Sequence, residues 1–383
     1  MGKPRVLTVV DNLTITTEPG TVHAVTAVRG IASAASITVS GVIRDSLNAP
    51  ITDSARTVTI AILNDPQTSG AAATLSGTAS VQSNAADGTY SFTGLSLNKE
   101  NTTTFTFRVT CETKTKDTAA FCVYHPVFNT APYTSADYLM SLCDINTVDP
   151  TGVRTLTITG GNVSRKHDPL NHAIYKNQAT SGEQCPEPAW NAACAFGADD
   201  GYDEAVAALV TVVGTQRDTF SVTIVADAVD RTAASGTYVD LRVNDTGTVN
   251  ASLYCYSVTG GLASFYCVDY RDGNPHIAEN TALDAIAENT PFFGMFVSPR
   301  NAALKAIVGA NTATGDTGAN VQTSALVDKF CVGMRSLSGS PAYIGALDTT
   351  NPRMFAEFYH NGDQSANAVA WRSALGTALG LSL

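Results

Sequence analysis

The sequence predicts a multidomain, β-rich protein: an N-terminal β-sandwich followed by a mixed β and α/β region. The chain has 383 residues, which is more than one domain usually holds. Short segments of alternating apolar and polar residues fill its first third, separated by turn signals such as "SLNAP", "AADG" and "NKENT". Towards the end, continuous apolar runs lie next to helix-like segments. The expected domains are residues 1–112, 113–275 and 276–383.

Three segments of the first domain show the two-residue period of β-strands: 57–63, 89–97 and 103–109. In the first of them, Val58 and Ile60 fall on one face and threonines on the other. Side chains alternate between the two faces of a strand, so each segment is expected to bury one face. Roughly seven short strands with this spacing predict a two-sheet sandwich.

The middle domain, 113–275, is predicted to be β-rich with a helix near 203–213, where "DEAVAALVTVV" is apolar and rich in alanine. A second short helix is expected at 133–143 and a loop at 185–201. Two apolar runs are expected to form a hairpin with a Gly-Gly turn at 260–261. The other strands expected in this domain are 154–161, 218–229 and 237–245.

Residues 276–383 are predicted to form an α/β domain, because continuous apolar strands alternate with helix-like segments. Asn280 is the expected N-cap of a helix over 280–289. A second helix, 299–311, begins with a proline and ends near Gly309. The third helix is expected at 365–380, and the strands at 292–298, 329–336 and 353–360.

Five segments of the first domain resemble, in order and composition, the immunoglobulin-like repeats of bacterial surface and phage proteins. They are "LTITTEP" (13–19), "VSGVIRDSLNAPITDS" (39–54), "TVTIAILNDP" (57–66), "LSGTASV" (75–81) and "YSFTGLSLNK" (90–99). The segment between the first two is longer than in that family, and the Cys…Trp…Cys spacing of antibody domains is absent. The resemblance implies a spacer or docking module, displayed outward, that carries no chemistry.

Two segments of the last domain resemble the core domain of contractile-phage tail sheath and related virion proteins. They are "ALDAIAENTPFFGMFV" (282–297) and "RMFAEFYHNGDQSANAVAW" (353–371). The chain stops at "LGLSL", where sheath proteins usually continue into an interlocking extension. This resemblance implies a subunit that assembles with copies of itself.

The composition favours protein partners over nucleic acid or membrane. Charged residues make up only 15% of the chain, and 23 lysines and arginines stand against 34 acidic residues, a net charge of −11. Nucleic-acid binding needs clustered cations, and no basic run is present. No apolar run is long enough for a membrane span, and "VLTVV" is too short for a signal peptide. We therefore expect a protein made in the host cytoplasm, and the resemblance to virion proteins implies that it is located in the virion.

Eight cysteines leave two possibilities open, buried free thiols or disulfides. Free thiols are favoured in a cytosolic protein, whereas bridges are favoured in one that ends up outside a cell. A hairpin centred on Lys116–Asp117 would set Cys111 opposite Cys122. The candidate disulfide pairs are Cys111–Cys122, Cys185–Cys194 and Cys255–Cys267, and Cys143 and Cys331 remain as candidate inter-chain thiols.

No motif predicts a catalytic, metal or cofactor site. His167, Asp168 and His172 are better explained by a surface loop, because the proline between them would break a helix that could align them. The acidic run at 197–204 lacks EF-hand spacing and is explained by a helix start. Residues 359–363, with a tyrosine, a histidine and an aspartate, are explained by a strand end and a turn. P-loop and G-x-S-x-G motifs are absent, so no cofactor is expected.

Together these patterns predict a non-enzymatic structural subunit of a bacteriophage virion, from a sheath- or collar-like assembly of the tail or neck. Its expected partners are copies of itself and other virion structural proteins. The alternative is a bacterial cell-surface adhesin or filament subunit. A third class, an enzyme with an accessory module such as a glycosidase, requires paired carboxylates in a cleft, which only the fold could bring together.

Overall fold

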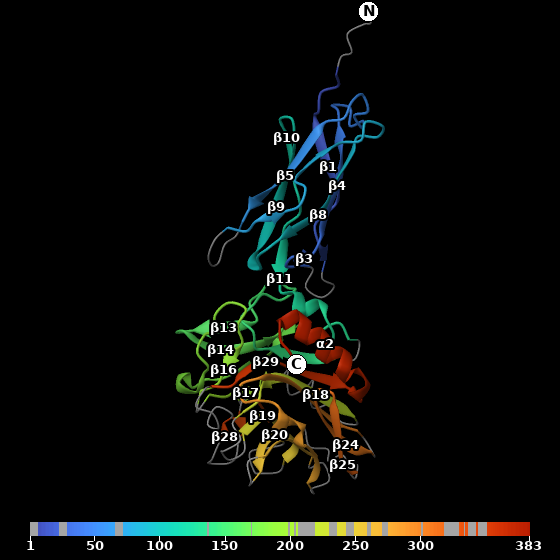
Figure 1. Cartoon of the computed structure of the whole chain (residues 1–383). Helices are drawn as coiled ribbons and strands as arrows, with labels where there is room; N and C mark the ends of the chain where they lie inside the picture. Colours follow the sequence, from blue (N-terminus) through green and yellow to red (C-terminus); the bar gives the residue numbers. More distant parts are fainter. Residues whose placement is uncertain are drawn as a thin grey trace, which may run out of the picture. The chain divides into compact units, whose positions relative to one another are not determined.

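The computed structural model separates the chain into two compact units (Figure 1). The first comprises Met1–Phe128 and Val148–Arg154, and the second Asn129–Thr147 and Thr155–Leu383. The residues that the structure describes are 7–22, 29–65, 72–135, 138–169, 171–197, 200–202, 204–205, 219–229, 236–242, 249–258, 262–269, 275–299, 302–317, 329–332, 334–335, 342–343 and 351–383.

The first unit is a β-sandwich. Within its described residues, one sheet has the strand order β1-β4-β8-β6 and the other β2-β3-β11-β9-β5-β7, with β10 paired to β9. Val39 and Phe92 of the first sheet share an apolar core with Phe107 and Phe121 of the second. The strands are β1 (Asn12–Thr17), β2 (Thr21–Val22), β3 (Arg29–Ala32), β4 (Ile37–Arg44), β5 (Thr57–Asn64), β6 (Leu75–Ser76), β7 (Ser80–Gln82), β8 (Thr89–Leu97), β9 (Asn101–Cys111), β10 (Lys114–Asp117) and β11 (Phe121–Tyr124).

The three strands predicted from period-two alternation in this unit are confirmed as β5, β8 and β9. Val58 and Ile60 are buried, whereas Thr57 and Thr59 between and beside them are exposed. Each strand therefore contributes one apolar face to the core and one polar face to the surface.

The predicted hairpin centred on Lys116–Asp117 is wrong. The chain turns earlier, at Glu112, which adopts a positive φ of 52°, and Lys114 pairs with Cys111. Cys122 lies instead on β11, which runs parallel to β3 and pairs with it at Gly30. The first unit therefore extends beyond residue 112, because β11 completes the sheet between β3 and β9.

The second unit contains several further sheets. Their strand orders, within the described residues, are β12-β29-β18-β23-β24-β25 with β16 paired to β29, β13-β14-β15-β17, β22-β21-β20-β19-β26, and β27-β28. The strands are β12 (Tyr138–Cys143), β13 (Leu156–Thr159), β14 (Asn162–Asp168), β15 (Asn171–Asn177), β16 (Cys194–Ala195), β17 (Glu204–Ala205), β18 (Phe220–Asp227), β19 (Gly236–Arg242), β20 (Val249–Val258), β21 (Leu262–Asp269), β22 (His276–Asn280), β23 (Pro291–Ser298), β24 (Ala303–Val308), β25 (Asn311–Thr317), β26 (Lys329–Val332), β27 (Met334–Arg335), β28 (Ala342–Tyr343) and β29 (Arg353–Asn361).

Short helices connect these strands. The 3-10 helices are η1 (Pro126–Asn129) in the linking region, η2 (Ser181–Glu183), η3 (Thr281–Ala285) and η5 (Ser365–Asn367). The α-helix α2 (Ala368–Leu379), red in Figure 1, confirms the helix predicted at the end of the chain. Within the described parts of the chain, no helix has the length and apolar composition that crossing a bilayer requires.

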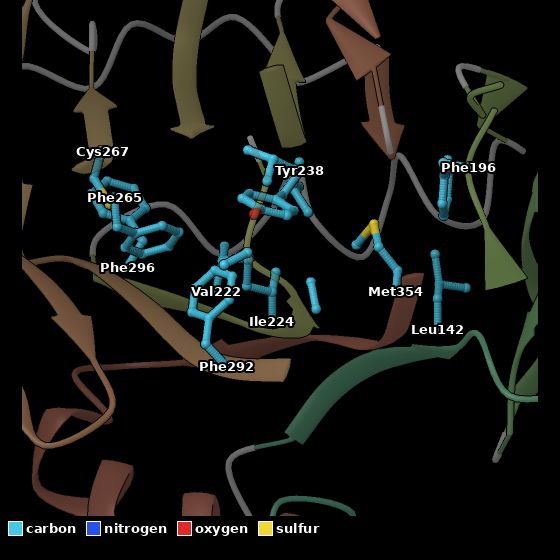
Figure 2. Close-up of a cluster of buried hydrophobic side chains, with 14 of the residues drawn as sticks. Leu142, Phe196, Val222, Ile224, Tyr238, Phe265, Cys267, Phe292, Phe296 and Met354 are labelled. Carbon is cyan, nitrogen blue, oxygen red and sulfur yellow. The ribbon is translucent and has the colours of Figure 1, made fainter. Parts of the chain in front are cut away.

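The sheet containing β29 is covered on both faces. Trp371 of α2 lies against His360 of β29, with ring centroids 4.3 Å apart. An apolar cluster gathers Ile224 and Phe292 of this sheet with Tyr238 and Phe265 of the β19–β22 sheet (Figure 2). Burial on both faces explains why β18, β23 and β29 lack a polar alternation in the sequence.

Two helices predicted in the second unit are strands. Residues 133–143 contain β12 and residues 299–311 contain β24, which pairs antiparallel with β23. Alanine and leucine favour helices, but sheet pairing and burial override that weak local preference. The strand–helix–strand order expected in residues 276–383 is therefore replaced by antiparallel hairpins ahead of α2.

The other helix predictions are only partly met. The segment 280–289 forms η3, and the Asn280 side chain accepts a hydrogen bond from the Ala282 N–H, as predicted for a cap. The sequence predicts a helix near 203–213. Only Glu204–Ala205 of that segment are described, and they form the strand β17. The broader prediction, a multidomain β-rich chain, is confirmed.

Candidate functional site: a buried charge cluster

Among the described residues of the second unit, four aspartate, glutamate or lysine side chains lie in the interior with no exposed surface: Asp144, Lys166, Lys176 and Glu357. We refer to them as the buried charge cluster. Two come from the β29 sheet and its margin, and two from the β13–β15 sheet. Charged groups are rarely fully buried unless they are paired, so the arrangement needs a physical explanation.

The two acidic residues reach the interior through the register of the β29 sheet. Glu357 lies opposite Leu142 of β12 and opposite Ile224 of β18. Directly opposed residues share a face, and both neighbours belong to the apolar cluster shown in Figure 2. Asp144 continues β12, since its N–H donates to the Phe355 carbonyl, and it follows Leu142 by two residues onto the same face.

The two lysines lie side by side on the facing sheet. Lys166 of β14 is directly opposite Lys176 of β15 and opposite Leu156 of β13. Leu156 belongs to the same apolar cluster, so this face of the β13–β15 sheet points inward. Two amines and two carboxyls thus meet in an interior without water access.

Lys166 contacts one acid of the cluster and two aromatic rings. Its Nζ donates a hydrogen bond to Asp144 Oδ1 and lies 4.5 Å from the Phe196 ring centroid and 4.3 Å from that of Tyr202. The Tyr202 hydroxyl donates to the Val163 carbonyl, which fixes the ring. Aromatic faces attract the amine electrostatically and exclude water, so they fix the position of Nζ.

Burial strongly perturbs the carboxyl groups. It raises the pKa of Glu357 well above its usual range; the charge of Asp144 raises that pKa further, and Lys166 and Lys176 lower it. Neither carboxyl oxygen of Glu357 has a hydrogen-bond partner among the described residues. Burial therefore favours the protonated form of Glu357, and the strand register places this residue next to Leu142, two residues before Asp144.

The Lys166–Asp144 pair shares one proton. Burial raises the pKa of Asp144, against the opposing charge of Lys166. Burial alone lowers the pKa of Lys166, but the charge of Asp144 and of nearby groups more than offsets it and raises that pKa. Protonation therefore belongs to the pair rather than to either group, and the ionic and neutral forms differ by one proton transfer along an existing hydrogen bond.

The six cysteines whose side chains are described are all buried free thiols: Cys111, Cys122, Cys143, Cys185, Cys194 and Cys267. The predicted Cys111–Cys122 bridge is contradicted, because Cys111 pairs with Lys114 and Cys122 with Gly30. The predicted Cys185–Cys194 bridge is likewise absent. Burial raises the pKa of Cys185 to about 12.

The remaining cysteine predictions meet different outcomes. The antiparallel pairing of the predicted hairpin is confirmed as β20–β21, while its Gly-Gly turn at 260–261 lies outside the described residues. Cys255 pairs with Phe265 and Cys267 with Leu253, so the two cysteines are offset by two residues along the same face. The side chain of Cys255 lies outside the description, as does that of Cys331 on β26. Cys143 is fully buried, so it is not placed to bridge a second chain.

The histidines of the 167–172 segment lie close together, with the ring centroids of His167 and His172 5.7 Å apart. His167, Asp168 and His172 lie on β14 and β15 rather than in a surface loop, and His167 Nε2 is 2.7 Å from Thr157 Oγ1. Asp363 pairs with Lys305 at 2.7 Å, away from the buried His360. Within the described residues, no three histidine, cysteine or acidic side chains are grouped to hold a metal ion.

The acidic run at 197–204 is only partly described. Asp200 Oδ2 accepts a hydrogen bond from the Gly197 N–H at 2.6 Å, which closes a local turn, and Glu204 lies in β17. Asp199 and Asp203 lie outside the described residues.

The buried charge cluster was missed from sequence, although a signal existed. Glu357 interrupts the apolar run "RMFAEFYH", and Lys176 interrupts the inward positions of "NHAIYKN". A charge within an otherwise buried strand pattern marks a polar group that the interior must accommodate. The four residues come together only because two sheets face each other, and the periodicity of the sequence does not reveal that arrangement.

Comparisons with known proteins do not assign a family. No protein-family model and no curated protein matches the chain. Among solved structures, a Trypanosoma rangeli sialidase with a difluorosialic acid is similar at 10% sequence identity and a TM-score of 0.42. The match covers 72% of this chain and 43% of the sialidase chain. The botulinum neurotoxin serotype C1 binding domain is similar at 12% sequence identity and a TM-score of 0.36. That match covers 62% of this chain and 52% of the toxin domain chain.

A third similar structure is a carbohydrate-binding module of a Ruminococcus gnavus sialidase bound to sialyllactose, at 10% sequence identity and a TM-score of 0.34. The match covers 43% of this chain and 86% of the module chain. At these values the similarities carry no functional argument. The chain spans less than half of the sialidase reported above. Asp144 and Glu357, the two acids of the buried charge cluster, have no exposed surface.

Proposed function

We propose that the protein is a non-enzymatic structural subunit of a bacteriophage virion, part of a tail or neck assembly, that binds copies of itself and other virion structural proteins. The observation that supports this best is the chemistry of the outward strand faces in the first unit. On β5 and β8 these faces present small, neutral side chains, whereas the ion pair of Arg108 and Asp117 lies beside Ala61 on the same sheet. The exposed residues are Thr57, Thr59 and Ala61 on β5, and Thr89, Ser91 and Thr93 on β8.

Such faces suit permanent contacts between subunits. Interfaces are depleted of lysine and glutamate at their centres, because burying a charge costs more than burying a hydroxyl that can find a partner. The chain as a whole has only 15% charged residues. With a net charge of −11 and no basic run, it also lacks the clustered cations that a nucleic-acid partner would need.

Sedimentation velocity at low and high salt tests this proposal. The full chain is expected to self-associate, or to bind a neighbouring virion protein, in a way that persists at high salt, because little of the attraction comes from screened charge. A strict monomer without a partner under every condition contradicts the proposal. Association that disappears at high salt contradicts the neutral-face mechanism.

Matched variants locate the contact. Thr59→Lys and Ser91→Lys each place a charge at the centre of one outer face, and at least one is expected to weaken association about tenfold, a cost of about 1.4 kcal/mol. Thr377→Lys adds the same charge to the exposed side of α2 and serves as the control. Equal behaviour of all three variants would show that the outer faces of the sandwich are not the contact.

The alternative, a bacterial cell-surface adhesin or filament subunit, uses the same neutral faces for a different assembly. The two roles differ in where the protein is found rather than in its contacts. Location of the native protein therefore distinguishes them.

A further inference from the structure

We propose that Lys166 and Asp144 form an intramolecular isopeptide bond, with Glu357 as the proton-transferring group. The bond would join the β13–β15 sheet to the β29 sheet covalently. It involves only residues of the second unit and is independent of the assembly role, because a cross-linked domain is compatible with either a virion or a surface protein. Three observations carry it: the contact between the two reacting groups, the enclosure, and the unpartnered carboxyl beside them.

The contact positions the nucleophile on its electrophile. Lys166 Nζ is hydrogen-bonded to Asp144 Oδ1, so the amine lies next to the carboxyl carbon. The rings of Phe196 and Tyr202 also lie against the amine. Well-oriented intramolecular groups reach effective molarities on the order of 10⁵–10⁸ M, which is far above the concentration of water that would reverse the condensation.

Enclosure makes the groups reactive. Asp144, Lys166 and Glu357 all have 0% exposed surface. In water an amine and a carboxylic acid exist as unreactive ions, whereas a low-dielectric interior disfavours separated charges. Transfer of one proton from Nζ to Oδ1 along their hydrogen bond removes both charges and gives a neutral amine and a neutral acid.

The third group supplies the proton transfers. Glu357 is fully buried and neither of its oxygens has a hydrogen-bond partner among the described residues, which is costly unless the group has another role. It lies close enough to Asp144 and Lys166 for their charges to act on its ionisation. A carboxylic acid can donate through one oxygen and accept through the other, so a single group can serve both partners.

The reaction balances without a co-reactant. The Nζ lone pair forms the N–C bond to Asp144 Cγ, while Glu357 protonates the carbonyl oxygen Oδ2 and receives a proton from the nitrogen. Glu357 then protonates one hydroxyl of the tetrahedral intermediate. The C–O bond breaks, one water leaves, and the remaining hydroxyl returns its proton to Glu357. The product is a secondary amide, and Glu357 is regenerated.

The exposed pair Lys305–Asp363 is a natural control within the same chain. Its Nζ–Oδ2 distance is 2.7 Å, but the side chains are 28% and 34% exposed. Solvent stabilises the ions there, so no amide is expected. Contact alone therefore does not suffice, and the enclosure with Glu357 distinguishes the two pairs.

Mass spectrometry of the denatured, reduced full chain tests the inference. The wild-type protein is expected to weigh one water molecule less than its sequence. Trypsin should fail to cleave after Lys166, and a branched peptide should join the segments that contain Asp144 and Lys166. A wild-type mass equal to the sequence with normal cleavage after Lys166 overturns the inference. Water loss that maps elsewhere, such as a succinimide at Asp87, also overturns it.

Variants test each role. Lys166→Met and Asp144→Ala are expected to abolish the mass loss, and Glu357→Gln to slow its appearance at least a hundredfold. Asp144→Asn should still react, losing ammonia instead of water and giving a product of the same mass as the wild-type product. Lys305→Met should keep the full water loss. If the cluster variants fail to fold by circular dichroism, the wild-type mass and the Asp144→Asn product still decide the outcome.

Discussion

Glu357 of β29 lies directly opposite Leu142 of β12, so a carboxyl group occupies a position on a face that neighbouring strands fill with apolar side chains. The register of one sheet thus places an acid in the interior, and the facing sheet supplies Lys166 and Lys176. The interior of the second unit therefore contains the four ionisable groups of the buried charge cluster without solvent, and its stability should respond strongly to changes at these few positions.

Stability of the second unit should fall as pH rises above the ordinary Glu value of 4.5, because the pKa of Glu357 is raised in the folded state. Between the pKa values of the unfolded and folded states, the native state holds one more proton than the unfolded state. The free energy of unfolding therefore falls by at most about 1.4 kcal/mol for each unit of pH increase. Glu357→Gln is expected to weaken this dependence. Urea midpoints followed by tryptophan fluorescence report the second unit, which contains both tryptophans, Trp190 and Trp371. Identical pH profiles for the two proteins would contradict the neutral buried acid.

Removing one partner of the buried pair should cost more than removing both. Asp144→Ala leaves the Lys166 amine buried without its partner and is expected to destabilise by about 3–5 kcal/mol. The double variant Asp144→Leu with Lys166→Met replaces both charges by apolar groups and should be markedly more stable than the single variant. Urea unfolding of the three proteins checks the order. A double variant as unstable as Asp144→Ala would count against an enclosed charge pair.

The described cysteines should resist modification in the native protein. Burial raises the pKa of Cys122 to about 11 and that of Cys185 to about 12, so little thiolate is present at neutral pH. Alkylation followed by peptide mass spectrometry is expected to label Cys143 and these two only after denaturation, without prior reduction. Rapid native labelling of Cys143 would indicate an accessible thiol, and labelling that requires a reductant would indicate a bridge.

The first unit should need β11 for its stability. A chain of residues 1–112 loses Phe121 and Val123 from the core and leaves β3 without its parallel partner. A chain of residues 1–128 is expected to melt cooperatively and at a higher temperature than the shorter one. Thermal circular dichroism of both fragments is the measurement. Equal melting temperatures would show that β11 is dispensable.

The sandwich of the first unit was predictable because its strands bury one face only. Val58 and Ile60 alternate with exposed threonines, and the sequence shows that period directly. The second unit was harder, since β18, β23 and β29 are buried on both faces and carry no alternation. An alanine-rich strand such as β24 then reads locally as a helix, and only its pairing with β23 determines its structure.

The buried charge cluster could not have been assembled from sequence spacing. Asp144 and Lys166 are 22 residues apart, but Glu357 comes from near the end of the chain. Their meeting depends on how two sheets face each other, which is a long-range property. What the sequence did show was a glutamate inside the apolar run "RMFAEFYH" and a lysine at an inward position of "NHAIYKN", and these two charges were the available signals.

Location of the native protein tests the assembly role most directly. Particles from cells that express the gene can be separated on a density gradient from cell-envelope fractions, and tryptic peptides of this chain quantified in each. The account predicts that the peptides co-sediment with tailed particles and remain there through a high-salt wash. Peptides confined to the cell-envelope fraction would contradict the virion role and favour the surface adhesin or filament instead.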